Sequence, residues 1–308
     1  MKLQNTIKDQ FFLKGRSLHR GELVNLKVLP APAGFGIQFR RVDVREKDPF
    51  VKAIYSYVSE THLCTKITNK DGISIQTIEH LMAALAGTGI HNVLIEVDGP
   101  ELPILDGSSR EFVKKILDTG KKELAEFIDG YKIKKVVQVS DGAAWARFTP
   151  SERFSIEFHI DYSGTVIGKQ NLALSMENGA FVRELCDSRT FCRESEISVL
   201  RSKGLAKGGT LGNAIVLEAN RVKNSGGLRL KDECVRHKML DAMGDLSLAG
   251  GPILGAFSSN CGGHTLTNRL LRAAFSDPAA IDPFKIDRDQ VFQLPGFGLK
   301  EQDFRRLV

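Results

Sequence analysis

The sequence predicts an α+β fold with two domains. Its 308 residues exceed what one typical hydrophobic core holds. Both halves contain segments in which β-branched and aromatic residues alternate with polar ones, as strands do. Helix patterns, with apolar residues at three- and four-residue steps, are interspersed among them. This mixed order is typical of α+β proteins.

Strands are expected at residues 23–29, 93–97, 131–139 and 155–160, and a helix at residues 109–118. The charged stretch 119–130 separates a helix pattern from strands, so we place the domain seam there. The predicted units are an N-terminal domain (1–124), a C-terminal domain (125–275) and a tail (276–308). The tail is rich in Asp, Pro and Lys. Partial disorder is its simplest interpretation, and a signal for turnover is the alternative.

Residues 235–246 form the most informative predicted helix. On it His237 and Asp241 are four residues apart, so an imidazole and a carboxylate project from one face. Asp245 adds a second carboxylate one turn later. Zinc accepts both ligand types, and two histidines with one carboxylate would also suit Fe²⁺. The spacing alone equally fits an ion pair in contact with solvent.

Residues 73–87 form a second predicted helix, with Ser74 or Thr77 as N-cap and Gly87 or Gly89 as its end. The uncharged run after His80 indicates burial, which makes Glu79 and His80 polar groups at the start of a buried helix. If His80 is a third ligand, Glu79 lies beside the coordinated water, where a general base belongs. Otherwise Glu79 simply interacts with the helix dipole.

His264 follows two glycines and is a candidate ligand, proton donor or loop residue. We interpret the other histidines (19, 62, 91 and 159) as structural or solvated. The candidate ligands come from both halves of the chain, so the site is expected at the domain interface.

Eight segments, taken in order, resemble one family. They are KGRSLHRGE (14–22), GIQFRR (36–41), QTIEHLMAALAGTGIHN (76–92), ELPILDGSS (101–109), DSRTF (187–191), KGLAKGGTLGNAIV (203–216), GLRLKDECVRHKMLDAMGDLSLAG (227–250) and GAFSSNCGGHTLTN (255–268). The family is that of the zinc-dependent UDP-3-O-acyl-N-acetylglucosamine deacetylases of lipid A, and hence lipopolysaccharide, biosynthesis. The resemblance implies two domains of similar topology, each packing helices against a β-sheet. One departure is Glu233-Cys234, where an aromatic residue is common; we expect a small packing change there.

The resemblance also implies the site residues. His80, His237 and Asp241 match the zinc ligands, and they leave one coordination position open for water. Glu79 matches the general base and His264 the general acid. Three further matches are Asp245, which orients that histidine, and Lys238 and Thr190, which surround the reacting carbonyl.

The family's substrate passage is carried over in the same way. An apolar insert, at about residues 193–222 here, encloses the fatty acyl chain in that family, although an ordinary strand–helix–strand piece of the core would have the same composition. The positions carried over are Leu63, Phe191, Ile197, Leu211, Ala214 and Val216. Lys238 is the best-placed cation for the diphosphate. Burying each methylene contributes about 0.8 kcal/mol, so a long acyl chain could dominate the affinity.

The implied function is hydrolysis of the N-acetyl group of UDP-3-O-acyl-N-acetylglucosamine, with metal-bound water as nucleophile. A zinc amidase with another substrate and a non-catalytic lipid-precursor binder are the alternatives. The net charge of +6 fits an anionic nucleotide sugar or a membrane surface, but no basic stripe with interleaved aromatics indicates nucleic acid. Five cysteines without a C-x-x-C pair indicate a reducing cytoplasm. No signal peptide or membrane-spanning run is apparent, and we expect a monomer.

Overall fold

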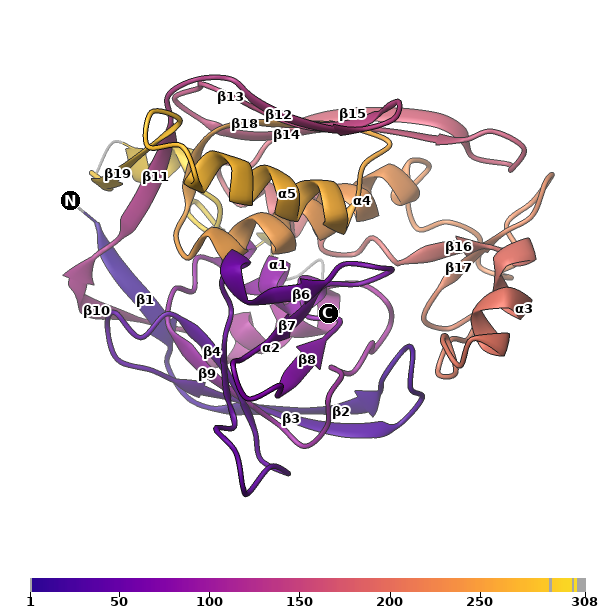
Figure 1. Ribbon diagram of the computed structural model, residues 1–308, viewed down its shortest axis with the longest axis horizontal. Helices are drawn as coiled ribbons and strands as arrows, with labels where there is room; N and C mark the ends of the chain where they lie inside the picture. The colour runs from indigo at the N-terminus through magenta and orange to yellow at the C-terminus, as the bar shows by residue number, and fades with distance from the viewer. Residues whose placement is uncertain (1, 288–289, 301, 304–308) are drawn as a thin grey trace.

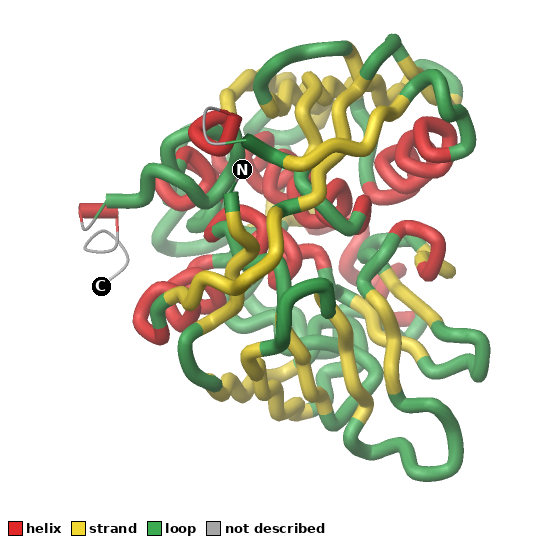
Figure 2. Tube along the Cα trace, turned by 90° about the vertical axis from the view of Figure 1, so that its left-hand side faces the viewer, coloured by secondary structure: helices red, strands yellow, loops and turns green. Residues whose placement is uncertain are grey.

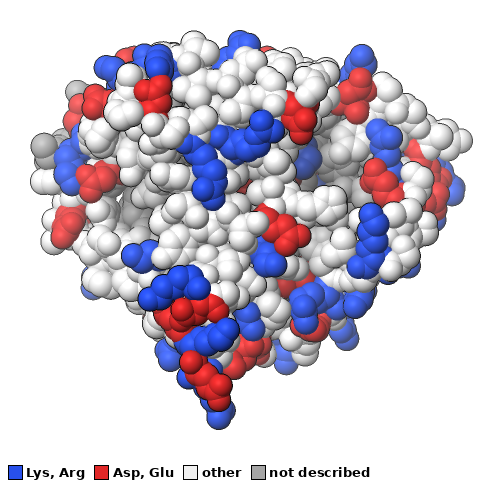
Figure 3. Space-filling view, in the orientation of Figure 1, with Lys and Arg blue, Asp and Glu red and all other residues white. Residues whose placement is uncertain are grey.

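The computed structural model describes residues 2–287, 290–300 and 302–303. Two β-sheets enclose a central layer of helices (Figure 1). The view turned by 90° shows the same arrangement, with strands on two opposite sides and helices between them (Figure 2). Charged side chains of both signs are interspersed over the face drawn in Figure 3.

The first half of the chain supplies a five-stranded sheet with the order β2-β3-β9-β4-β5. Its strands are β2 (Phe11–Arg16), β3 (Leu23–Pro30), β4 (Ile37–Arg41), β5 (Phe50–Lys52) and β9 (Val93–Val97). Alternate residues of β3 and β9 are buried, as expected for a sheet with one face in the core. The helices α1 (Glu79–Thr88) and α2 (Arg110–Thr119) lie over this sheet (Figure 1). A small sheet beside them contains β6 (Val58–Glu60), β7 (Lys66–Thr68) and β8 (Ser74–Gln76).

The second half supplies a seven-stranded sheet built around β18 (Ile253–Asn260). The other strands are β11 (Asp129–Ile133), β12 (Val137–Asp141), β13 (Ala144–Thr149), β14 (Phe154–Tyr162), β15 (Gly168–Ser175) and β19 (Ile281–Lys285). The long helices α4 (Glu233–Leu246) and α5 (His264–Phe275) cover its inner face (Figure 1). In β14 the residues Phe154, Ile156, Phe158 and Ile160 are buried against them, and the intervening residues are less buried.

The remaining elements connect or extend these layers. β1 (Leu3–Ile7) and β10 (Lys121–Phe127) pair antiparallel. β16 (Phe191–Arg193), α3 (Glu194–Ser202) and β17 (Ile215–Leu217) form an insert beside the main body, at the right of Figure 1. The described ranges also contain the short helical turns η1 (Tyr55–Tyr57), η2 (Phe181–Leu185), η3 (Ser247–Ala249) and η4 (Gln290–Gln293). None of the helices in the described ranges is long and apolar enough to cross a membrane.

The α+β prediction is confirmed, and the helix expected at 235–246 forms as α4. The helix expected at 73–87 begins later than predicted, because residues 74–76 pair with β7 as strand β8. Thr77 then takes a positive φ of 59°, which ends the strand. This backbone conformation rules Thr77 out as the N-cap of α1. The predicted end at Gly89 is correct, since this residue is the left-handed C-cap of α1.

Two other expectations, the strand at 131–139 and the disordered tail, need correction. The strand expected at 131–139 is two strands, β11 and β12, on opposite sides of β18 and β13 in the sheet order. The predicted seam 119–130 contains β10, which pairs antiparallel with β1, and its role as a domain boundary stays a prediction. Residues 281–285 of the expected tail form β19, which pairs with β11. Phe304–Val308, at the end of that tail, lie outside the described residues.

Candidate metal and catalytic site

Helix α4 presents three polar side chains on one buried face. His237, Asp241 and Asp245 follow one another at four-residue steps, and each is at most 5% exposed. The imidazole Nε2 of His237 lies 3.3 Å from Oδ1 of Asp241. The interpretation of this pair as a solvated surface ion pair is therefore excluded.

Helix α1 brings His80 to the same point from the other half of the chain. Its Nε2 lies 3.6 Å from Oδ1 of Asp241, and its ring centroid is 5.0 Å from that of His237. One ligand atom from each of the three residues lies within 4.8 Å of the other two. Within the described ranges, no other trio of His, Cys, Asp or Glu side chains converges in this way.

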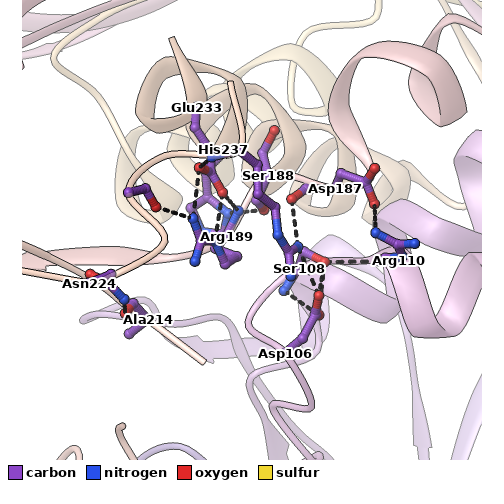
Figure 4. A network of polar contacts seen from close by, with 12 residues as sticks. Asp106, Ser108, Arg110, Asp187, Ser188, Arg189, Ala214, Asn224, Glu233 and His237 are labelled. Carbon is purple, nitrogen blue, oxygen red and sulfur yellow. Dashed lines mark hydrogen bonds and ion pairs between the residues drawn. The ribbon is translucent and has the colours of Figure 1, made fainter. Parts of the chain in front are cut away.

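These separations fit a divalent cation. Ligands at about 2.1 Å around a tetrahedral zinc ion are roughly 3.4 Å apart, close to the two distances to Asp241. Burial lowers the pKa of His237 to about 3, so its ring is neutral and Nε2 keeps a lone pair. Its Nδ1 lies 3.0 Å from the Ser188 carbonyl oxygen, which fixes Nδ1 as the protonated nitrogen (Figure 4). His80, His237 and Asp241 therefore form a suitable ligand set.

Gly244 allows the two helices to meet. A Cβ atom at this position would lie 2.1 Å from the carbonyl oxygen of Glu79, the first residue of α1. The start of α1 thus packs directly on the backbone of α4, with no side chain between them. This close approach brings His80 near the two ligands on α4.

Lys238 neutralises part of the charge at the site. Its Nζ donates a hydrogen bond of 2.8 Å to Oδ2 of Asp241. Burial would lower the pKa of Lys238, but Asp241 outweighs that effect and raises it above the ordinary value. Burial would likewise raise the pKa of Asp241, but the Lys238 ammonium, a hydrogen bond with His80 and the charge of His264 hold it well below its usual range. The carboxylate is therefore ionised and available as a ligand.

Glu79 is a buried carboxyl group beside this ligand set. Only 3% of it is exposed, and its Oε2 accepts a hydrogen bond of 3.1 Å from the Thr65 backbone N–H. Burial raises the pKa of Glu79 above its ordinary value, which suits a group that accepts and releases a proton.

His264 is the first residue of α5 and is buried, which excludes the solvated-loop interpretation. Its Nδ1 lies 2.7 Å from Oδ2 of Asp245, and its Nε2 lies 4.0 Å from Oδ2 of Asp241. Burial would lower the pKa of His264, but the Asp245 carboxylate more than compensates and raises it to about 9. The ring is therefore protonated at neutral pH and can donate a proton.

A buried ion pair that the sequence analysis missed supports the His237 ring. Glu233 is fully buried, and its carboxylate accepts hydrogen bonds from the guanidinium and backbone N–H of Arg189 and from the backbone N–H of Arg229. Arg189 follows Ser188, so the ion pair holds the carbonyl group that contacts His237 (Figure 4). The charge of Glu233 thus anchors a buried polar network, and the small packing change expected at Glu233-Cys234 stays an expectation.

The proposed substrate residues differ in exposure, and one of them, Phe191, lies against a ligand residue. The Phe191 ring centroid is 6.1 Å from that of His237, and Phe191 pairs in register with Ile215 of β17. Val216 is buried, whereas Thr190, Ile197 and Ala214 are partly exposed. Leu211 and Leu63 are 47% and 43% exposed, Leu211 on the insert and Leu63 two residues before Thr65.

A cavity of about 510 Å³ lies elsewhere, between the C-terminal ends of α1 and α4. It is lined by residues such as Ala86, His91, Phe154, Met243 and Leu246, and by none of the candidate site residues. We therefore base the site on the converging side chains rather than on this cavity.

Comparison with known proteins agrees with the motif resemblance. Residues 4–276 match the family model described as LpxC, UDP-3-O-acyl N-acetylglycosamine deacetylase. A UDP-3-O-acyl-N-acetylglucosamine deacetylase of Pasteurella multocida (strain Pm70) is 44% identical over 93% of this chain and 94% of the relative. Proteins of the same name from Haemophilus influenzae (strain PittEE) and Idiomarina loihiensis are 43% and 42% identical, over 94% and 93% of this chain and 96% and 94% of the relatives.

Proposed function

Because the chain belongs to the UDP-3-O-acyl N-acetylglycosamine deacetylase family, we propose that it removes the N-acetyl group of UDP-3-O-acyl-N-acetylglucosamine in lipid A biosynthesis. The products are acetate and UDP-3-O-acyl-glucosamine. The observation that carries this proposal is the convergence of His80, His237 and Asp241 beside a buried carboxyl group and a protonated histidine.

The three converging residues would hold Zn²⁺, or Fe²⁺, which suits the same donor set. When bound, the cation would lower the pKa of water from about 15.7 towards about 7 and polarise the amide carbonyl. Lys238 and the Ser188 carbonyl hold Asp241 and His237 in place for this role. The neutral His237 ring needs to lose no proton before it binds the cation.

Glu79 accepts the proton of the attacking water, since it is buried beside the ligands and its raised pKa makes it a stronger base than an ordinary carboxylate. His264, kept protonated by Asp245, donates a proton to the departing amine nitrogen. The Thr190 hydroxyl is the side-chain donor that we assign to the developing oxyanion.

The insert would enclose the acyl chain. Phe191, Ile197, Leu211, Ala214 and Val216 lie on it, and we assign Leu63, from the other half of the chain, to the same passage. Lys238 is the cation that we assign to the diphosphate. The apolar insert beside the ligands favours an acylated substrate over that of another amidase.

We also propose the division into domains 1–124 and 125–275, with 276–308 as a tail. The division is supported by the five-stranded sheet, because all of its strands lie within residues 11–97. A cytoplasmic monomer remains our expectation. The five cysteines, free in the structure, are consistent with a reducing compartment.

Acetate release from UDP-3-O-acyl-N-acetylglucosamine tests the function. The metal-free protein should be inactive, and one equivalent of Zn²⁺ should restore acetate release. A protein that binds one zinc ion and releases no acetate would favour the non-catalytic binder. Release from a short N-acetyl amide at the same rate as from the acylated UDP-sugar would favour a different amidase.

A further inference from the structure

Thr65 is the one residue in the described ranges that hydrogen bonds to both Glu79 and Asp245. Its backbone N–H donates to Oε2 of Glu79 at 3.1 Å. Its hydroxyl Oγ1 donates to Oδ1 of Asp245 at 2.6 Å. Thr65 is 2% exposed, so neither contact is in competition with bulk water. It therefore connects the candidate base to the carboxylate that holds the candidate acid.

The two oxygens of Asp245 have different partners. Oδ1 accepts from Thr65, which lies in the first half of the chain, and Oδ2 pairs with Nδ1 of His264 on α5. Two donors on opposite sides fix the rotation of a carboxylate, and the carboxylate in turn fixes the imidazole ring. Without the hydroxyl, Oδ1 of Asp245 would be buried without a partner, which favours rearrangement of the pair.

A second contact ties the same loop to α5. Thr61 Oγ1 lies 2.8 Å from Oγ1 of Thr265, the residue after His264. Residues 61–65 therefore bridge the two halves of the molecule, with contacts to Glu79 of α1, Asp245 of α4 and Thr265 of α5. Of the two threonines, Thr65 alone is buried and contacts the carboxyl groups of Glu79 and Asp245.

We propose that Thr65 is a positioning residue that fixes the Asp245–His264 pair relative to Glu79. The proposal rests on the proposed function, since it concerns the base and the acid of that reaction. The hydroxyl acts on His264 through Asp245, and the backbone N–H acts on Glu79 directly. Only the first of these two contacts can be removed by changing the side chain.

The test uses Thr65→Val, which keeps the shape and the backbone N–H but removes the hydroxyl. We expect kcat to fall at least about 10-fold with KM changed less than about twofold, because positioning acts on the reacting groups rather than on substrate binding. Thr65→Ser should restore most of the rate. The matched control is Thr68→Val, three residues further on in β7, which removes a hydroxyl bonded to Ser59 of β6 and should leave kcat unchanged.

A double-mutant cycle separates positioning from a purely structural role. In an Asp245→Ala background, Thr65→Val should lower kcat less than about twofold further, because the hydroxyl has lost the group through which it acts. In the metal-free protein, the Nδ1–H proton of His264 should exchange faster in the variant, as followed by proton NMR. Both measurements are repeated on Thr65→Ala, which lacks the γ-methyl groups of valine. A result shared by the two variants cannot come from a disturbance of the loop by valine.

The proposal is overturned if Thr65→Val and Thr65→Ala keep wild-type kcat, or if their loss is undiminished in the Asp245→Ala background. Either result, obtained with an active wild-type enzyme, leaves the proposed function intact. Absence of acetate release from the zinc-loaded wild-type protein would instead contradict the proposed function itself.

Discussion

Replacing Gly244 by alanine tests whether the close approach of α1 to α4 creates the metal site. The added Cβ would lie 2.1 Å from the Glu79 carbonyl oxygen and 2.8 Å from its carbon, whereas real Cβ contacts essentially never fall below 3.0 Å. The obstructing atoms belong to the backbone, so the start of α1 must move by about 0.9 Å or more. His80 lies one residue further along that helix and must move with it.

The expected effect is larger on the site than on stability. Metal–ligand distances hold within about 0.2 Å, so this displacement should weaken zinc binding at least about 10-fold. A misplacement near 1 Å costs about 100-fold in rate, which sets the expected loss in kcat/KM. Overpacking costs about 1–3 kcal/mol, and alanine gains about 1 kcal/mol over glycine inside a helix. The free energy of unfolding should therefore fall by no more than about 2 kcal/mol.

Three assays measure these quantities: competition with a chelator for zinc affinity, acetate release for kcat/KM, and urea denaturation for stability. Gly226→Ala is the matched control, because no atom lies within 4 Å of the position that its Cβ would take. A Gly244→Ala protein with wild-type zinc affinity and kcat/KM would refute the reasoning, since His80 would then bind from a displaced helix without loss.

The same geometry predicts four further results. Glu79→Ala and His264→Ala should each lower kcat at least about 100-fold with zinc retained, as checked by turnover and metal analysis; near-normal turnover of Glu79→Ala would make the base assignment wrong. His237→Ala should lose zinc as well, since it removes one of three ligands, and full zinc content in that variant would exclude His237 as a ligand. A plot of kcat/KM against pH should rise as Glu79 ionises, above its ordinary pKa of 4.5, and fall as pH increases past about 9, where His264 loses its proton; an absent alkaline limb would contradict the acid assignment. Glu233→Ala should lower the free energy of unfolding in urea by about 3–5 kcal/mol, because the Arg189 guanidinium loses its buried partner, and a change below about 1 kcal/mol would show that water replaces the carboxylate.

Local pattern was sufficient for the ligands on α4. The spacing of His237 and Asp241 on one helix face is a property of the sequence alone, and the structure keeps it. The burial of Glu79 and His80 was also predictable, because an uncharged run follows them. The strand β8 was missed because its residues also fit the helix periodicity of the segment that follows. The pairing of β8 with β7 and the positive φ of Thr77 delay the start of α1, and neither can be read from that periodicity.

The supporting residues gave little local signal. Thr65 lies just before β7, where the sequence has no distinctive pattern. The positioning role proposed for it depends on a hydrogen bond to Asp245, which lies 180 residues later. Glycine is unfavourable inside a helix, so the sequence alone gives no reason for Gly244. Its presence is explained by the close approach of α1 at this position. A charged residue at the start of a helix, such as Glu233, normally reads as a solvated first turn, so the buried pair with Arg189 could not be predicted without the tertiary contact.

The position of a bound zinc ion tests the account most directly. Crystals grown with Zn²⁺ and measured at the zinc absorption edge should give one strong anomalous peak, about 2.0–2.2 Å from Nε2 of His80, Nε2 of His237 and the Asp241 carboxylate. A peak bound to other residues, or imidazoles of His80 and His237 too far apart to share one ion, would contradict the account.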